Sequence, residues 1–212
     1  PGATGNGFGF PPEWEPHDAV WMGWTRQVAG DEDLQALWAE MIIALTPHVA
    51  VTLLAASEAA ADEARGRLEA HGVDFANVRF FVQQTTDVWL RDSGPLFITD
   101  GARLRLADFG WSYYGFPFPF ADPEGLARGR LDKEVAEGMG LTARTSPLVA
   151  EGGGLDVSSQ VMLAYRDTAM QRNTGASLAE IEAEYLRLYG KQKIVWLDRA
   201  PLSDRVFVGP KI

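Results

Sequence analysis

The chain has 212 residues, of which 46% are hydrophobic and 23% charged, a composition that excludes an intrinsically disordered chain and predicts a soluble globular body. Its formal net charge of −10, with the 19 Lys and Arg residues spread along the chain, excludes a basic footprint for nucleic acid and suits a cationic small molecule. The complete lack of cysteine excludes a disulfide framework, a thiolate metal site and a thiol nucleophile within these residues.

Three alternating αβ stretches are predicted, beginning with a flexible lead over residues 1–10. The first stretch is a strand at 19–24, a helix at 34–45, a strand at 49–54, a helix at 57–71 and a strand at 78–82. The second is strands at 88–91, 96–99 and 104–107, an aromatic segment at 109–120, a helix at 124–139 and a strand at 142–145. The third is strands at 154–157 and 161–165, a loop, a helix from Ser177 and a strand at 194–197. The fold class is therefore α/β with mixed strand pairing, in a single domain over residues 1–212.

The segment from Asp87 to Pro95 is the most informative stretch, because two acids, an arginine and a tryptophan surround a strand end. A carboxylate accepts two parallel hydrogen bonds from a planar guanidinium, and an indole face attracts a cation, so Trp89 and Asp92 form a plausible half-cage. An ideal strand puts them on different faces, so a bend near Asp92 is required. On residue types alone, an Asp–Arg ion pair at a sheet edge beside a core tryptophan is the simpler interpretation.

A second carboxylate, Glu151, directly precedes three glycines, residues 152–154, which permit a close backbone approach to it. The segment lacks the pattern of a phosphate-binding loop. A tight hairpin turn with a solvated glutamate is an equally good interpretation from these residues alone.

Two further segments carry polar or aromatic residues, and a purely structural role is the favoured interpretation of each. The polar run at 171–175 is expected to be only a connection. The aromatic segment at 109–120 either lines a pocket or covers an exposed sheet edge, and we favour covering.

In this order, five segments together resemble the agmatine deiminase and Porphyromonas-type peptidylarginine deiminase family, nearly from end to end. They are the opening strand at 12–24, the Asp-Val-Trp-Leu-Arg-Asp-Ser-Gly-Pro run at 87–95, Glu-Gly-Gly at 151–153, Gln-Arg-Asn at 171–173 and Ile-Val-Trp-Leu at 194–197. The resemblance implies a pentein-like αβ propeller of ββαβ modules, of which the chain covers roughly three of five. It also implies substrate-binding roles for Trp89, Asp92 and Glu151, which are expected to lie around one concavity.

The reaction implied by the resemblance is deimination, in which a thiolate attacks the guanidinium carbon, ammonia leaves, and hydrolysis yields a ureido product. The enzyme class is thus a hydrolase acting on C–N bonds of amidines, and neither a metal nor an organic cofactor is needed. The family's Gly-His-x-Asp motif and its nucleophilic cysteine do not occur in the sequence. None of the nucleophile or general acid–base residues is present, so the 212-residue chain itself is expected to be inactive.

A chain that starts at Pro1 and stops shortly after an apolar stretch at 206–208 is expected to be a piece of a larger protein. The alternative function is a non-catalytic protein that binds guanidino compounds, and an amidinotransferase or dihydrolase relative is disfavoured. The expected partner is a cationic guanidino small molecule or a peptidyl arginine, with neither nucleic acid nor membrane, and with self-association into a homo-oligomer. No signal segment or membrane-length apolar run is seen, which favours a cytoplasmic location.

Overall fold

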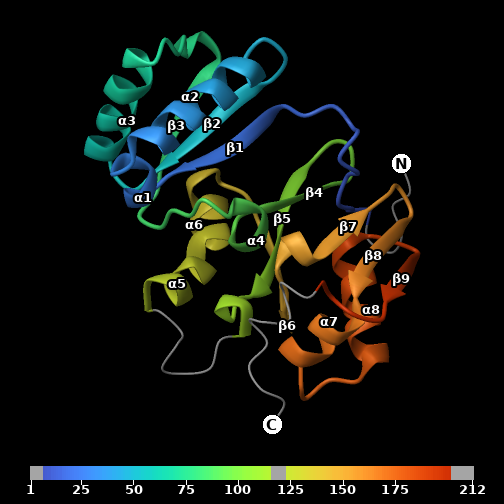
Figure 1. Ribbon diagram of the computed structural model, residues 1–212. Coiled ribbons are helices and arrows are strands. Elements are labelled where there is room, and N and C mark those ends of the chain that lie inside the picture. Colours follow the sequence, from blue (N-terminus) through green and yellow to red (C-terminus); the bar gives the residue numbers. More distant parts are fainter. Residues whose placement is uncertain (1–6, 116–122, 202–212) are drawn as a thin grey trace. The chain divides into compact units, whose positions relative to one another are not determined.

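The computed structural model describes residues 7–115 and 123–201, which contain three three-stranded sheets flanked by helices (Figure 1). The chain divides into two compact units. One unit is continuous, Pro16–Leu90, whereas the other combines Pro1–Glu15 with Arg91–Ile212. The α/β class expected from the sequence is confirmed.

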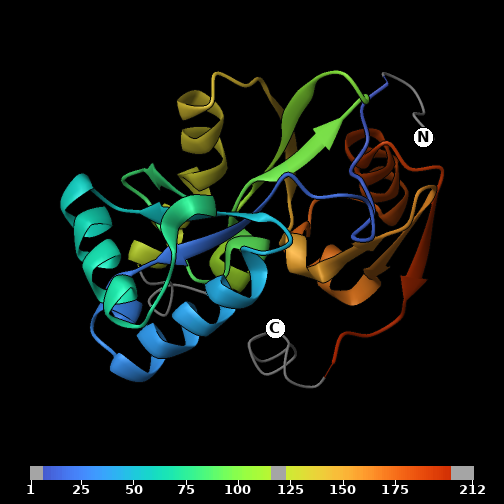
Figure 2. The same ribbon diagram turned by 90° about the horizontal axis from the view of Figure 1, so that it is seen from above.

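The unit Pro16–Leu90 is a βαβαβ arrangement around a fully parallel sheet in the order β1-β2-β3. Helices α2 and α3 pack against this sheet (Figures 1 and 2). All residues of the central strand β2 are buried. Its elements are β1 (Ala19–Trp24), α1 (Arg26–Ala29), α2 (Glu32–Leu45), β2 (Ala50–Ala55), α3 (Glu58–Ala70), η1 (Phe75–Asn77) and β3 (Val78–Val82).

Helices α2 and α3 each begin at a polar residue whose side chain caps the first turn. Asp31 Oδ1 accepts hydrogen bonds from the backbone nitrogens of Asp33 and Leu34 at 3.0 and 3.1 Å, and α2 starts at the next residue. Ser57 Oγ accepts from the nitrogen of Ala60 at 3.1 Å and opens α3. The helix expected to end before Pro47 does so, since α2 ends at Leu45.

The other unit contains the two remaining sheets, each of which has a ββαβ order. In each sheet the first two strands are antiparallel and the third joins in parallel, so the expected mixed pairing is found here. The ββαβ module implied by the resemblance therefore describes two of the three sheets, and β1-β2-β3 departs from it. The elements are α4 (Leu90–Ser93), β4 (Leu96–Thr99), β5 (Leu104–Gly110), η2 (Tyr113–Gly115), α5 (Pro123–Ala127), η3 (Arg128–Arg130), α6 (Leu131–Gly138), β6 (Ala143–Val149), η4 (Gly152–Gly154), β7 (Leu155–Val157), β8 (Val161–Tyr165), α7 (Arg166–Arg172), α8 (Leu178–Tyr189) and β9 (Lys193–Leu197).

One hydrophobic core joins both sheets of this unit to α8. The predicted capping box at Ser177 is confirmed, because its hydroxyl accepts from the nitrogen of Glu180 while the Glu180 carboxylate accepts from the nitrogen of Ser177. The helix buries Ile181 and Leu188 completely and ends at Gly190, whose φ of 62° closes it in the left-handed region.

The N-terminal lead expected to be flexible is anchored in its described part, residues 7–10. Gly9 pairs with Thr99 at the edge of β4, and the nitrogen of Phe10 donates to the carbonyl of Tyr189. The side chain of Phe8 is buried in the core. Aromatic burial thus overrides the glycine-rich composition that suggested flexibility.

Two expectations for helices are also corrected. The single helix predicted at 124–139 is interrupted, with η3 separating α5 from α6. Aromatic rings occupy the space beside the two glycines of this stretch, since an added Cβ at Gly125 would lie 2.5 Å from the Tyr113 ring and one at Gly129 would lie 2.7 Å from Trp111 Cβ. Glycine lowers helix propensity, which favours the break. The loop expected before Ser177 instead contains α7.

Candidate guanidinium-binding site

Asp92 lies in a short helix rather than at the end of a strand. The structure forms α4 where we expected a strand over residues 88–91, so the proposed alternation of side chains along that strand is wrong. Upstream, the buried Asp87 carboxylate accepts a hydrogen bond from the nitrogen of Trp89 at 3.2 Å, which favours a turn. Gly94 precedes Pro95, a position that disfavours the helical region, and the helix ends before it.

The Asp92 carboxylate is held at both oxygens by groups distant in sequence. Its Oδ1 accepts from the backbone nitrogen of Gly153 at 3.1 Å, and its Oδ2 accepts from the hydroxyl of Tyr114 at 2.9 Å. These bonds fix the plane of the carboxylate. They also attach α4 to the glycine turn η4 that follows Glu151.

The glycines of η4 are required by close packing against α4. An added Cβ at Gly152 would lie 2.3 Å from the carbonyl oxygen of Arg91, and one at Gly153 would lie 2.1 Å from Asp92 Oδ1. No heavy atom lies within 4 Å of the corresponding position at Gly154. The close approach predicted from these glycines therefore exists, although α4 makes it rather than the backbone beside Glu151.

Glu151 is buried and paired, which overturns the interpretation of a solvated hairpin glutamate. Its Oε1 accepts from Nε of Arg172 at 2.8 Å, and the two side chains are only 7% and 6% exposed. A buried carboxylate needs such a partner, because removing an isolated charge from water is very costly. Arg172 closes α7, in the polar segment that we interpreted as only a connection. Its guanidinium shows that the surroundings of Glu151 suit a planar cation.

Asn173 fixes the strand that delivers Glu151. Its Oδ1 accepts from the nitrogen of Val149 at 2.8 Å, while its Nδ2 donates to the carbonyls of Val149 at 3.0 Å and Ala169 at 2.9 Å. The amide thereby ties the end of β6 to α7. Neither Arg172 nor Asn173 was assigned a site role from the sequence, and the Gln-Arg-Asn motif was the only available signal for them.

Arg91 has a structural role in this region. It forms an ion pair with Glu13, and its Nε and Nη2 donate to the carbonyls of Gly152 and Leu155 at 3.2 and 3.4 Å. The guanidinium also lies over the ring of Phe10, 5.6 Å from the centroid. The Asp–Arg ion pair considered as the simpler interpretation is thus replaced by a pair between Arg91 and Glu13.

Trp89 belongs to the unit Pro16–Leu90, where its side chain is 63% exposed. Asp92 and Glu151 belong to the discontinuous unit and are connected through η4. Two small cavities accompany the carboxylates of Asp92 and Glu151. One is lined by Asp92 and the other by Glu151, and Ala150 lines both. Their volumes of about 20 and 10 Å³ provide room for roughly one water molecule each.

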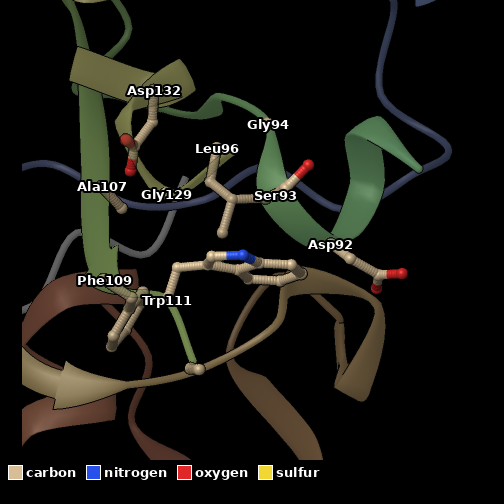
Figure 3. Close-up of a pocket in the computed structure, with 10 residues that line it drawn as sticks. Asp92, Ser93, Gly94, Leu96, Ala107, Phe109, Trp111, Gly129 and Asp132 are labelled. Carbon is tan, nitrogen blue, oxygen red and sulfur yellow. The ribbon is translucent and has the colours of Figure 1, made fainter. Parts of the chain in front are cut away.

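The cavity beside Asp92 is shown in Figure 3, where the Asp92 carboxylate points away from the indole of Trp111. Trp111 lines this cavity and donates from Nε1 to the carbonyl of Gly125 at 2.7 Å. Phe109 lines it from β5. The interpretation that the aromatic segment covers a sheet edge is therefore wrong for Phe109 and Trp111, while residues 116–120 lie outside the described residues.

A second acidic group, Asp132, lines the same cavity from α6. Burial raises the pKa of Asp132 to about 8, and the negative charge of Asp108 and a hydrogen bond with it act in the same direction. Asp108 is itself buried, accepts from the hydroxyl of Thr145 at 2.7 Å and lies 3.5 Å from Nζ of Lys133. Asp132 therefore keeps its proton under neutral conditions.

Within residues 7–115 and 123–201, no three His, Asp or Glu side chains gather in a way that would hold a metal ion. Among the helices formed by these same residues, none has the length and apolar character needed to cross a bilayer.

Solved structures share this fold over most of the chain. The agmatine deiminase of Enterococcus faecalis superimposes with a TM-score of 0.74 at 21% identity, covering 90% of this chain and 53% of that one. A C. jejuni agmatine deiminase with substrate bound superimposes with a TM-score of 0.70 at 23% identity, covering 90% of this chain and 56% of that one. The fold is therefore that of the agmatine deiminase structures over the matched part.

The sequence itself matches the family described as Porphyromonas-type peptidyl-arginine deiminase over residues 9–206. The chain belongs to this family. It is also 30% identical over 212 residues to the agmatine deiminase of Pseudomonas aeruginosa strain LESB58, an alignment that covers 94% of this chain and 55% of the relative. The chain thus spans little more than half the length of the curated relative it matches.

Proposed function

We propose that the chain forms the substrate-positioning part of a guanidino-group deiminase, which converts a guanidinium into a ureido group and releases ammonia. The observation that carries the proposal is the Asp92 carboxylate, held at both oxygens beside the turn that follows the buried Glu151. An oriented carboxylate suits a planar cation, because it can accept two parallel hydrogen bonds from a guanidinium. Membership of the deiminase family supports the same function.

In this proposal Asp92 binds the guanidinium of the substrate. Glu151 supplies a second carboxylate directly before η4, and Arg172 pairs with it. The formal net charge of −10 favours the approach of a cationic substrate. The substrate class is thus a small guanidino compound such as agmatine, or a peptidyl arginine.

The covalent step needs a nucleophile, and the 212 residues contain no cysteine. In the reaction a thiolate adds to the guanidinium carbon, a protonated amino group leaves as ammonia, and water then cleaves the carbon–sulfur bond. We propose that the thiol and the histidine that moves the proton are supplied by residues outside this sequence. Positioning of the substrate is insufficient for deimination when no nucleophile is present. The chain alone is therefore expected to release no ammonia.

Binding of agmatine to the purified chain, followed by calorimetry or by NMR shifts, tests the site. We expect weak binding that Asp92→Asn reduces at least tenfold, since the variant removes the charge while keeping the shape of the side chain. Asp62→Asn, which removes one charge from an exposed position of α3, is the matched control and should bind as the wild type does. Equal affinity for all three proteins would refute the assignment of Asp92.

An ammonia assay on the same protein tests the location of the nucleophile. Release of ammonia that Asp92→Ala abolishes would show that these residues carry the chemistry themselves. A protein that contains the whole family domain and binds agmatine without releasing ammonia would instead support the non-catalytic binding function.

Self-association is also proposed, on the basis of an apolar strip on β8 and β9. Leu163 and Val195 are neighbours in the strand register and are 36% and 40% exposed, and Leu197 on the same strand is 37% exposed. Exposed apolar surface of this kind favours association between copies. Light scattering that shows only a monomer at high concentration would contradict the proposal.

A further inference from the structure

The turn η2 holds three consecutive residues in the left-handed region of backbone conformation. The φ angles are 50° at Tyr113, 61° at Tyr114 and 75° at Gly115. Glycine adopts such angles without cost, whereas a bulky residue does so only where its surroundings enforce it. Two adjacent tyrosines in this region therefore call for a specific cause.

Aromatic packing supplies part of the cause. The ring of Tyr114 makes an edge contact with Trp111 at a centroid distance of 5.0 Å, and the ring of Tyr113 lies so close to Gly125 that a side chain there would collide with it. Arg128 lies over the Tyr113 ring at 5.9 Å. The turn is consequently locked against α5 and η3.

The packing leaves Tyr114 aimed at Asp92. Its hydroxyl donates to Oδ2 at 2.9 Å, while the nitrogen of Gly153 donates to Oδ1 at 3.1 Å. An ionised carboxylate has about four lone-pair positions, and a planar guanidinium binds a carboxylate through two parallel hydrogen bonds. One donor on each oxygen also stops the carboxylate from rotating about its terminal bond.

Gly115 brings the same turn against the other carboxylate. An added Cβ at Gly115 would lie 2.8 Å from Nη1 of Arg172, the residue whose Nε binds Glu151. Any side chain at this position would push the Arg172 guanidinium away. The turn therefore contacts the Asp92 carboxylate directly, through the Tyr114 hydroxyl, and the partner of Glu151, Arg172, at the position where Gly115 has no side chain.

We propose that η2 is a positioning element and that Tyr114 is a positioning residue, which orients Asp92 for a planar cation without touching the substrate itself. The inference rests on the proposed function for its substrate, although the orientation of Asp92 can be measured without any ligand. A carboxylate with a fixed plane favours a guanidinium, which presents two parallel N–H groups, over an ammonium, which does not. Tyr114 thereby contributes to the discrimination between guanidino compounds and simple amines.

The test compares Tyr114→Phe with Tyr113→Phe, two variants that each remove one hydroxyl from the same turn. The first readout is hydrogen exchange of the Gly153 amide, which is bonded to Asp92. We expect exchange about tenfold faster in Tyr114→Phe, the size expected when a bond to a charged group is lost, and little change in Tyr113→Phe. Unchanged Gly153 exchange in a folded Tyr114→Phe protein would overturn the proposal.

The second readout is the ratio of affinities for agmatine and for putrescine, a diamine without a guanidinium. We expect the ratio to fall severalfold in Tyr114→Phe and to stay constant in Tyr113→Phe. In the background of Asp92→Asn, adding Tyr114→Phe should have no further effect on Gly153 exchange, because the tyrosine acts through Asp92. An additive effect would assign Tyr114 a general structural role and refute positioning, even if Tyr114→Phe alone proved unstable.

The two readouts separate this inference from the proposed function. Faster Gly153 exchange in Tyr114→Phe, in a protein that binds neither ligand, supports the positioning of Asp92 and counts against guanidinium binding by this chain. If Tyr114→Phe leaves the ratio of affinities for agmatine and putrescine unchanged while Asp92→Asn abolishes binding, the proposed function stands. The positioning role of Tyr114 is then refuted.

Discussion

The backbone nitrogen of Gly153 donates a hydrogen bond to Oδ1 of Asp92, across a sequence separation of 61 residues. The bond exists only because α4 and η4 approach so closely that there is no space for a side chain at Gly152 or Gly153. Adding one methyl group at either glycine should therefore displace the Asp92 carboxylate.

Gly153→Ala should destabilise the protein by about 1–3 kcal/mol and disrupt the bond to Asp92, because the new methyl group would overlap Oδ1. Gly154→Ala is the matched control and should change the free energy of unfolding by no more than about 0.5 kcal/mol, since the added Cβ meets no atom within 4 Å. Urea unfolding of the two variants measures the difference. Equal stabilities would show that η4 can shift away from α4 at little cost.

Asn173→Asp should destabilise the protein by about 2 kcal/mol or more. The carboxylate cannot donate, so the carbonyls of Val149 and Ala169 would face an acceptor in a buried place. Thr174→Ala, at the exposed neighbouring position, controls for mutation in the same loop. Thermal unfolding monitored by circular dichroism compares them, and a stable Asn173→Asp protein would contradict the role given to the amide.

Stability should fall with rising pH because of Asp132. Its pKa is raised from 3.8 to about 8, so the folded protein keeps a proton that the unfolded chain releases. The stabilisation is complete below the unfolded value and is lost as pH rises through the folded one. Asp108 and Lys133 are the charged groups that face it.

The pH dependence is measured by urea unfolding at intervals between about pH 5 and pH 9, where the raised pKa of Asp132 takes effect. The unfolding free energy of Asp132→Asn should fall less steeply than that of the wild type. Asp62→Asn, at an exposed position, should follow the wild type. Parallel curves for all three proteins would mean that Asp132 holds no proton in this range.

Lys191→Met should destabilise the protein by about 1–3 kcal/mol. The ammonium donates to the carbonyls of Phe10 and Ser158, both at 2.6 Å, and to that of Ser159 at 3.4 Å. Methionine fills the space without donating. Limited proteolysis should cut residues 7–13 faster in the variant, whereas Lys193→Met, at an exposed position of β9, should leave the rate unchanged.

Local sequence patterns predicted the elements whose formation is decided locally. The helix from Ser177 has a capping box and an apolar stripe, and β2 and β9 are mainly apolar, with Thr52 and Lys193 as their polar residues. The short helices α4 and α7 were missed, because neither has room for a periodic stripe and the residue before α7, Tyr165, makes no side-chain cap.

The partners of the proposed site residues could not be predicted, because they depend on contacts between distant segments. Arg172 reaches Glu151 across 21 residues, and Tyr114 reaches Asp92 across 22. The positive φ of Tyr114 gives no signal in the sequence, since tyrosine is not a residue that such turns favour. The sequence did allow us to infer roles for Asp92, Glu151 and the glycines, because their residue types restrict what they can do.

The bond from Lys191 to the carbonyl of Phe10 joins residues separated by 181 positions, and it has a consequence for the nascent chain. At about 5–20 residues per second, a ribosome needs roughly 10–40 s to add the lysine after the phenylalanine. The sheet β1-β2-β3 is complete much earlier, because all its strands lie within Pro16–Leu90. During that interval the aromatic side chains of Phe8 and Phe10 have left the ribosome without the core that later covers them, and they are available to chaperones.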